Sequence, residues 1–121
     1  MSAGVVLAVG LVGGLGAVAR FTLDGAVSAR VGGAFPWGTL AVNLTGAFLL
    51  GVLAGVTLSP DAYRIAATGF LGAFTTFSTW MLESHRLGED GRLRLGVTNL
   101  LGSLALGLLA VWLGRELGGV L

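Results

Sequence analysis

The sequence predicts an all-α membrane protein with four transmembrane helices, forming one domain over residues 1–121. Hydrophobic residues make up 55% of the 121-residue chain and charged residues only 11%, whereas soluble domains carry about a quarter charged residues. Four stretches carry no ionisable side chain and come close to or exceed the roughly 20 residues that a membrane-spanning helix needs: 1–19, 31–60, 65–82 and 95–114. The 22 glycines, more than one residue in six, favour close contact between such helices.

The four helices are expected at about residues 4–27, 37–57, 61–85 and 93–117, each justified by an apolar run and by the breakers beside it. The first helix has no basic segment ahead of it, which favours a retained span over a signal peptide. Gly32, Gly33 and Pro36 separate the first two helices, and Pro60 precedes the third. Residues 88–91 (Gly-Glu-Asp-Gly) form the last connection, so the predicted bundle is up-and-down with short loops.

The charges specify orientation only weakly. The formal net charge is +1, with Arg64 and Arg115 on the face of the two termini and four arginines on the opposite face (Arg30, Arg86, Arg92 and Arg94). By the positive-inside rule this small difference favours the four-arginine face as cytoplasmic, yet a chain so evenly charged can insert both ways. A pore through a single bundle of four short spans would have little protein around it, so we expect function to require an oligomer.

The sequence lacks the residues that several classes of protein require. The chain has no cysteine, no cluster of basic residues suited to a polyanion, and no motif that pairs a nucleophile with a base. We therefore expect neither an enzyme nor a nucleic-acid-binding protein.

The third helix carries the densest polar signal. Residues 69–80 read Gly-Phe-Leu-Gly-Ala-Phe-Thr-Thr-Phe-Ser-Thr-Trp, with four hydroxyls in five positions near the middle of the span. Such hydroxyls bond local backbone groups, and glycines such as Gly72 add backbone freedom. We expect a break near the midplane, at Gly72, rather than a continuous helix whose hydroxyls bond back to the preceding turn. Freed carbonyls at a break can coordinate a cation, and freed N–H groups favour anions.

Polar residues also mark the second and fourth helices. Asn43 lies four residues after Thr39, and Ser103 lies four residues after Asn99, so each pair shares a helix face. Asn43 either bonds a neighbouring helix or lines a wet path, and the second polar stripe favours the path. Gly-xxx-Gly pairs at 10/14, 51/55 and 114/118 predict close packing within and between chains.

Three motifs together resemble the fluoride channel family (Fluc, also called CrcB). They are residues 13–21 (Gly-Gly-Leu-Gly-Ala-Val-Ala-Arg-Phe), 36–43 (Pro-Trp-Gly-Thr-Leu-Ala-Val-Asn) and 69–80, and the resemblance runs through the whole chain in order. It implies an antiparallel, dual-topology homodimer in the cell membrane, which in a bacterium is the plasma or inner membrane. It also implies passive export of cytoplasmic fluoride down its electrochemical gradient, which confers fluoride resistance, and a structural sodium ion (Na⁺) at the dimer centre.

The resemblance assigns residues to these roles by motif. The Na⁺ site is expected at the backbone carbonyls of Gly72 and Thr75. The fluoride pathway is expected to include Asn43, Phe77, Ser78, Thr79, Trp80 and Ser103. The vestibule or entrance is expected at Arg20, Thr39 and Glu83. Two positions depart from the family pattern: Trp80 stands where Phe is usual and adds an N–H donor, and Asn99 stands where relatives often carry an aromatic residue.

Two other functions fit four small spans. A dimeric multidrug or cation antiporter would need a carboxylate deep in the membrane, and the first helix has none before Asp24. A non-transporting membrane scaffold would still dimerise, and would lose no transport, when Asn43 is replaced by alanine.

Overall fold

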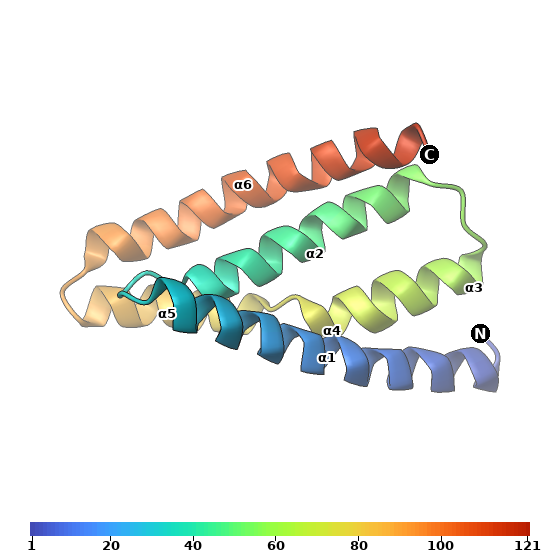
Figure 1. Cartoon of the computed structure of the whole chain (residues 1–121), viewed down its shortest axis with the longest axis horizontal. Coiled ribbons are helices and arrows are strands. Elements are labelled where there is room, and N and C mark those ends of the chain that lie inside the picture. The colour runs from blue at the N-terminus through green and yellow to red at the C-terminus, as the bar shows by residue number, and fades with distance from the viewer.

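The computed structural model describes all residues, 1–121, and is built of helices alone (Figure 1). Two helices precede the third span, α1 (Ala3–Val31) and α2 (Trp37–Gly55), and α6 (Leu93–Gly119) follows it. The third span has four parts: α3 (Pro60–Tyr63), the π-helix η1 (Arg64–Leu71), α4 (Gly72–Phe74) and α5 (Phe77–Glu89). All four spans are long and apolar enough to cross a membrane, which confirms the predicted fold class.

Most apolar side chains lie on the outside of the bundle. Only 15 of the 121 residues are buried, while Leu7, Leu11 and Leu15 on α1 are each about two-thirds exposed. Water would penalise such a surface, whereas lipid tails solvate it, so the exposed leucines fit a lipid-facing helix. The small core lies around the third span and includes Val42, Leu71 and Phe74.

Three helices end later than the sequence predicted. α1 runs to Val31 rather than 27, because Gly32 (φ +66°) and Gly33 (φ +82°) are the first residues in a backbone region that L side chains rarely adopt. The third span ends at Glu89 rather than 85, just before Gly91 (φ +76°), and α6 reaches Gly119 rather than 117. The exception is α2, which stops at Gly55 rather than 57.

α2 and α6 lie side by side along their length and make the most extensive helix contact in the fold (Figure 1). A methyl group added at Gly51 would collide with the Val111 carbonyl oxygen, and one at Gly114 with the Phe48 carbonyl oxygen. Two of the three predicted Gly-xxx-Gly pairs, 51/55 and 114/118, thus face each other and let the two backbones touch. The third pair, 10/14, lies on the open side of α1, where an added methyl would meet nothing within 4 Å.

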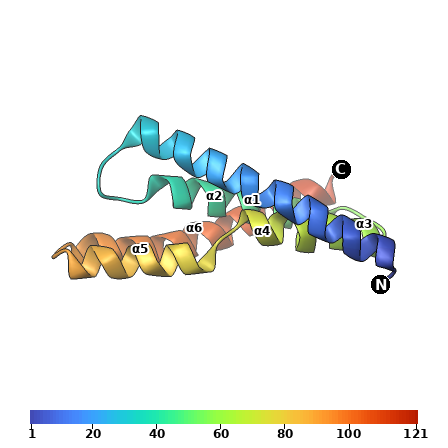
Figure 2. The same ribbon diagram turned by 90° about the horizontal axis from the view of Figure 1, so that it is seen from below.

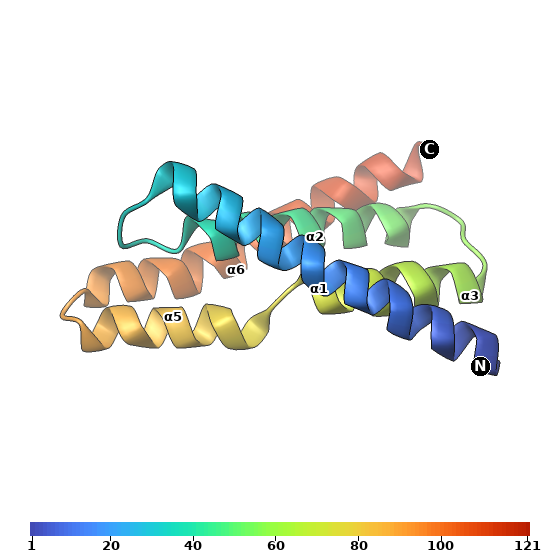
Figure 3. The same cartoon turned by 60° about the horizontal axis from the view of Figure 1, so that its bottom comes forward.

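α1 lies obliquely across the third span, as Figures 2 and 3 show from two further directions. The crossing again uses glycines, since Gly13 approaches Gly69 and a methyl at Gly16 would collide with the Phe70 carbonyl oxygen. The chain termini lie at one end of the bundle, with the α1–α2 and α5–α6 connections at the other (Figure 1).

The third span is broken, but at Thr75–Thr76 rather than at Gly72. Gly72 keeps helical angles (φ −60°, ψ −36°), whereas Thr75 (φ −86°, ψ 159°) and Thr76 (φ −143°, ψ 120°) are extended. The threonine hydroxyls stabilise both ends of the break. Thr75 Oγ1 donates to the Leu71 carbonyl at 2.9 Å, and Thr76 Oγ1 accepts from the Thr79 N–H at 3.2 Å as the N-cap of α5. Side-chain capping, not glycine flexibility, therefore sets the position of the break.

Candidate functional site

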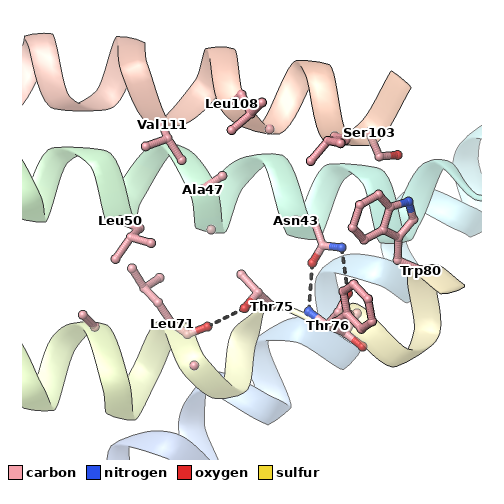
Figure 4. A pocket seen from close by; sticks show the side chains of 16 residues that line it. Asn43, Ala47, Leu50, Leu71, Thr75, Thr76, Trp80, Ser103, Leu108 and Val111 are labelled. Atoms are coloured by element: carbon pink, nitrogen blue, oxygen red, sulfur yellow. Dashed lines mark hydrogen bonds between the residues drawn. The ribbon is translucent and has the colours of Figure 1, made fainter. Parts of the chain in front are cut away.

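Asn43 on α2 reaches across to the break and pairs with Thr76 (Figure 4). Its Nδ2 donates to the Thr76 carbonyl at 2.8 Å, and the Thr76 N–H donates to its Oδ1 at 2.9 Å. Backbone groups freed at membrane depth need such partners, because no water is there to replace them. An amide carries two N–H donors, and only one of those on Asn43 is used within the chain.

A cavity of about 400 Å³ opens beside this pair, between α2, the broken span and α6 (Figure 4). Its lining is mainly apolar and contains no ionisable side chain. Six of the site residues expected from the sequence line it: Asn43, Gly72, Thr75, Phe77, Trp80 and Ser103. The structure thus brings together residues from three spans that lie up to 60 positions apart.

Two expected pathway residues lie outside this cavity. Ser78 is exposed and makes no side-chain hydrogen bond, while the Thr79 hydroxyl accepts from Thr76 Oγ1 at 3.0 Å beside the α5 N-terminus. Conversely, Thr76 lines the cavity although the sequence assigned it no role. Thr76 is the N-cap of α5, and the sequence signal for this role is a threonine, a residue type preferred at N-caps, three positions before Thr79.

The two aromatic rings at the cavity are in edge contact. The centroids of Phe77 and Trp80 lie 5.7 Å apart with an interplanar angle of 89°. Phe77 is 70% exposed in the single chain, so its ring projects away from the bundle. The extra donor expected of Trp80 is already in use, because its Nε1–H donates to the Asn99 carbonyl at 3.0 Å.

Two of the three expected vestibule residues, Thr39 and Glu83, lie in the half of the bundle away from the termini. The buried Thr39 hydroxyl donates to Glu83 Oε1 at 2.5 Å, linking α2 to α5. Glu83 also lines a second, more polar cavity of about 280 Å³ together with Arg86 and Asp90. Arg20 is half-buried, lines neither cavity and forms no ion pair with Asp24, whose carboxylate accepts from Ser28 at 3.2 Å.

The backbone around the break offers oxygen atoms suited to a cation. The Thr75 carbonyl accepts no hydrogen bond, and the Gly72 carbonyl loses its usual helical donor because the Thr76 N–H turns to Asn43. No carboxylate or imidazole lines the cavity beside the break, so a cation there would be held by neutral oxygen atoms. Carbonyl oxygens suit hard cations, so the residues present fit an Na⁺ ion.

This fold and site define a small multi-pass membrane protein whose interrupted span borders a cavity with an amide at its wall. A family model described as "CrcB-like protein, Camphor Resistance (CrcB)" matches residues 7–115. The chain therefore belongs to the CrcB family, which confirms the resemblance seen in its motifs.

Curated relatives match over nearly their whole length. "Fluoride-specific ion channel FluC 2" of Mycolicibacterium paratuberculosis is 53% identical over 109 residues, which cover 90% of this chain and 89% of the relative. "Fluoride-specific ion channel FluC 1" of Symbiobacterium thermophilum is 47% identical over 116 residues, covering 91% and 94%. "Fluoride-specific ion channel FluC" of Geobacter sulfurreducens is 47% identical over 114 residues, covering 90% and 92%.

Proposed function

We propose that this protein is a passive, fluoride-selective ion channel that lets cytoplasmic fluoride leave the cell down its electrochemical gradient. The proposal is supported by the relatives reported above, which are named fluoride-specific ion channels and are about half identical to this chain over most of its length. The observation in the structure that carries the proposal is the second N–H of Asn43, which is unused and borders the cavity beside the break.

A small anion gives up its water in a narrow path only if the path supplies hydrogen-bond donors in return. The Asn43 N–H supplies one, held in place because the same side chain is anchored to Thr76 on both sides. The rings of Phe77 and Trp80 present further electropositive edges, which contact an anion without binding it strongly. Anchoring the donor in advance lowers the cost of reorganising it when the ion arrives.

The functional unit in this proposal is an antiparallel homodimer. In the single chain the cavity is open and mainly apolar, and Phe77 projects from it, so a second copy would close the path. An Na⁺ ion would lie at the dimer centre, held by the carbonyls of Gly72 and Thr75 and supplying a fixed positive charge. The unpartnered Thr75 carbonyl supports this placement.

The antiporter alternative loses support at the cavity, which is lined by no carboxylate that could couple substrate to protons. A proteoliposome assay tests the proposal directly. Purified protein reconstituted into vesicles is expected to release trapped fluoride, followed with a fluoride electrode, and to release chloride far more slowly. Absence of fluoride efflux, or equal chloride efflux, would refute the selective channel.

A further inference from the structure

Asn99 on α6 is almost completely buried, at 1% exposed, and does not line the cavity. An amide buried in this way is costly unless its groups are paired. Each polar side-chain atom of Asn99 has a partner: Nδ2 donates to Ser84 Oγ at 2.8 Å, and Oδ1 accepts from Ser103 Oγ at 3.2 Å. Asn99 thus connects Ser84 on α5, outside the cavity, with Ser103 at the cavity wall.

The direction of these hydrogen bonds follows from counting protons. Ser84 has one hydroxyl proton and gives it to the Trp80 carbonyl at 2.8 Å, so its oxygen can only accept from Asn99. The Asn99 amide must therefore turn its NH₂ group to Ser84 and its oxygen to Ser103. The amide oxygen of Asn99 can only accept, so Ser103 donates its single hydroxyl proton to Asn99.

Ser103 lies at the cavity wall (Figure 4). Because its proton is donated to Asn99, it offers the cavity lone pairs rather than a proton. The indole N–H of Trp80 is committed in the same way to the Asn99 backbone carbonyl. This side of the cavity is therefore short of donors, whereas Asn43 on α2, which lines the same cavity, keeps an unused N–H.

We propose that Asn99 and Ser84 are positioning residues that keep the Ser103 proton out of the ion path, so that fluoride is not held there. The proposal rests on the channel function proposed above. Conduction requires each binding site to be weak enough to release its ion, and a freed hydroxyl proton beside the Asn43 donor would bind fluoride more tightly. The effect would be larger for fluoride than for chloride, because the smaller anion accepts the stronger hydrogen bond.

Ser84→Ala is the sharpest test because Ser84 does not line the cavity. The substitution frees the Asn99 amide to turn its NH₂ group towards Ser103, whose proton is then released. We expect fluoride efflux to fall about five-fold, the factor for one net hydrogen bond, with a smaller fall for chloride. Asn99→Leu, which removes the acceptor, is expected to act in the same direction.

The proposal requires that the fall in fluoride efflux depend on the Ser103 hydroxyl. In a Ser103→Ala background, Ser84→Ala and Asn99→Leu are expected to cause no further change in either efflux rate. Thr98→Val is the matched control, because Thr98 lies next to Asn99 on α6 but is exposed and bonds only the Arg94 carbonyl, at 2.7 Å. Unchanged fluoride-to-chloride ratios in both variants, or equal changes with and without Ser103, would overturn the proposal.

Two further measurements separate the possible failures. With Trp37 and Trp112 replaced by phenylalanine, Trp80 is the sole tryptophan, and its emission is expected to stay unchanged in Ser84→Ala. A red shift of that emission would mean general loosening of the packing around Trp80 and would overturn the specific role.

If the unmodified protein passes no fluoride, the proposed channel function fails. The network is then judged by thermal unfolding, where additive effects of Ser84→Ala and Asn99→Leu would refute it and non-additive effects would support it.

Discussion

Asn43 forms two hydrogen bonds with the backbone of Thr76, 33 residues further along the chain. One side chain thereby satisfies both the N–H and the carbonyl of the residue at which the third span is broken. The pair explains how an extended residue is tolerated between two helical segments at membrane depth.

Replacing Asn43 with leucine removes both bonds and leaves two part-buried backbone groups of Thr76 without partners. Each orphaned group costs about 1–3 kcal/mol, so Asn43→Leu is expected to lower the free energy of unfolding by about 2–6 kcal/mol. The same change removes the free N–H at the cavity, so fluoride efflux is expected to disappear. Thermal unfolding in detergent and vesicle efflux measure the two effects.

Thr45→Val is the matched control for this substitution. Thr45 lies two residues along α2, is exposed and makes no side-chain hydrogen bond within the chain. It is expected to leave stability and efflux unchanged. An Asn43→Leu protein as stable and as active as Thr45→Val would show that the pair has no importance.

The glycine contact between α2 and α6 gives a second prediction. Gly51→Ala and Gly114→Ala would each drive a methyl group into the carbonyl oxygen of the facing helix. Backbone cannot yield as a flexible side chain can, so each is expected to destabilise the protein by about 1–3 kcal/mol. Gly102→Ala on α6, where an added methyl meets nothing within 4 Å, is expected to stabilise or be neutral, as helix propensity predicts. Equal melting temperatures for Gly102→Ala and Gly114→Ala would contradict the close packing.

The spans were predictable from the sequence because charge scarcity and length alone define them. The exact position of the break in the third span was not predictable. Gly72 is the more flexible residue, but the break falls at Thr75–Thr76, where Leu71, Asn43 and Thr79 supply partners for the threonines. Two of those three partners are local, whereas Asn43 becomes one only when α2 packs on the third span.

The hydrogen-bond directions at the cavity were likewise outside the reach of the sequence. The sequence placed Ser103 on a polar stripe with Asn99, and the structure confirms that the two side chains touch. Whether Ser103 offers a proton depends on Ser84, which lies on another helix and bonds both Asn99 and the Trp80 carbonyl. A spacing rule within one helix cannot contain that information.

Thr39 and Glu83 give a third prediction, because their hydrogen bond ties α2 to α5 near the polar end of the bundle. Thr39→Val removes the donor from a buried position and is expected to cost about 1.5–3 kcal/mol, as bonds to charged groups do. Glu83→Gln keeps an acceptor oxygen and is expected to cost less. In a double-mutant cycle with Glu83→Ala, which removes the acceptor, unfolding free energies of Thr39→Val and Glu83→Ala that simply add would show that the bond does not stabilise the fold.

The orientation of the chain gives a fourth prediction. Arg64 and Arg115 belong to the end with the termini, and the other end carries four arginines, so the bias between the two orientations is small. Reporters fused to the C-terminus are expected to give signal on both sides of the membrane. Adding four lysines after Leu121 reverses the difference, to six basic residues at the terminus end against four at the other, and is therefore expected to favour a cytoplasmic C-terminus and to lower efflux by depleting the antiparallel partner. A single orientation in the unmodified protein would contradict dual insertion.

Sodium removal tests the proposed cation site at the break. A ligand that binds only the folded protein stabilises it by an amount that grows with its concentration, about 2.7 kcal/mol at one hundred times its Kd. Replacing sodium with a bulky organic cation is therefore expected to lower the melting temperature and to weaken the dimer, and restoring sodium should reverse both. Gly46→Ala supplies the matched variant, because its added methyl would collide with the side chain of Thr75 and displace the carbonyl that the site requires. That variant is expected to melt at a lower temperature and to lose its sodium dependence, whereas Gly102→Ala should keep it. A melting temperature that is independent of sodium in the unmodified protein would refute the site, because an ion bound at the carbonyls of Gly72 and Thr75 cannot bind the folded state without stabilising it.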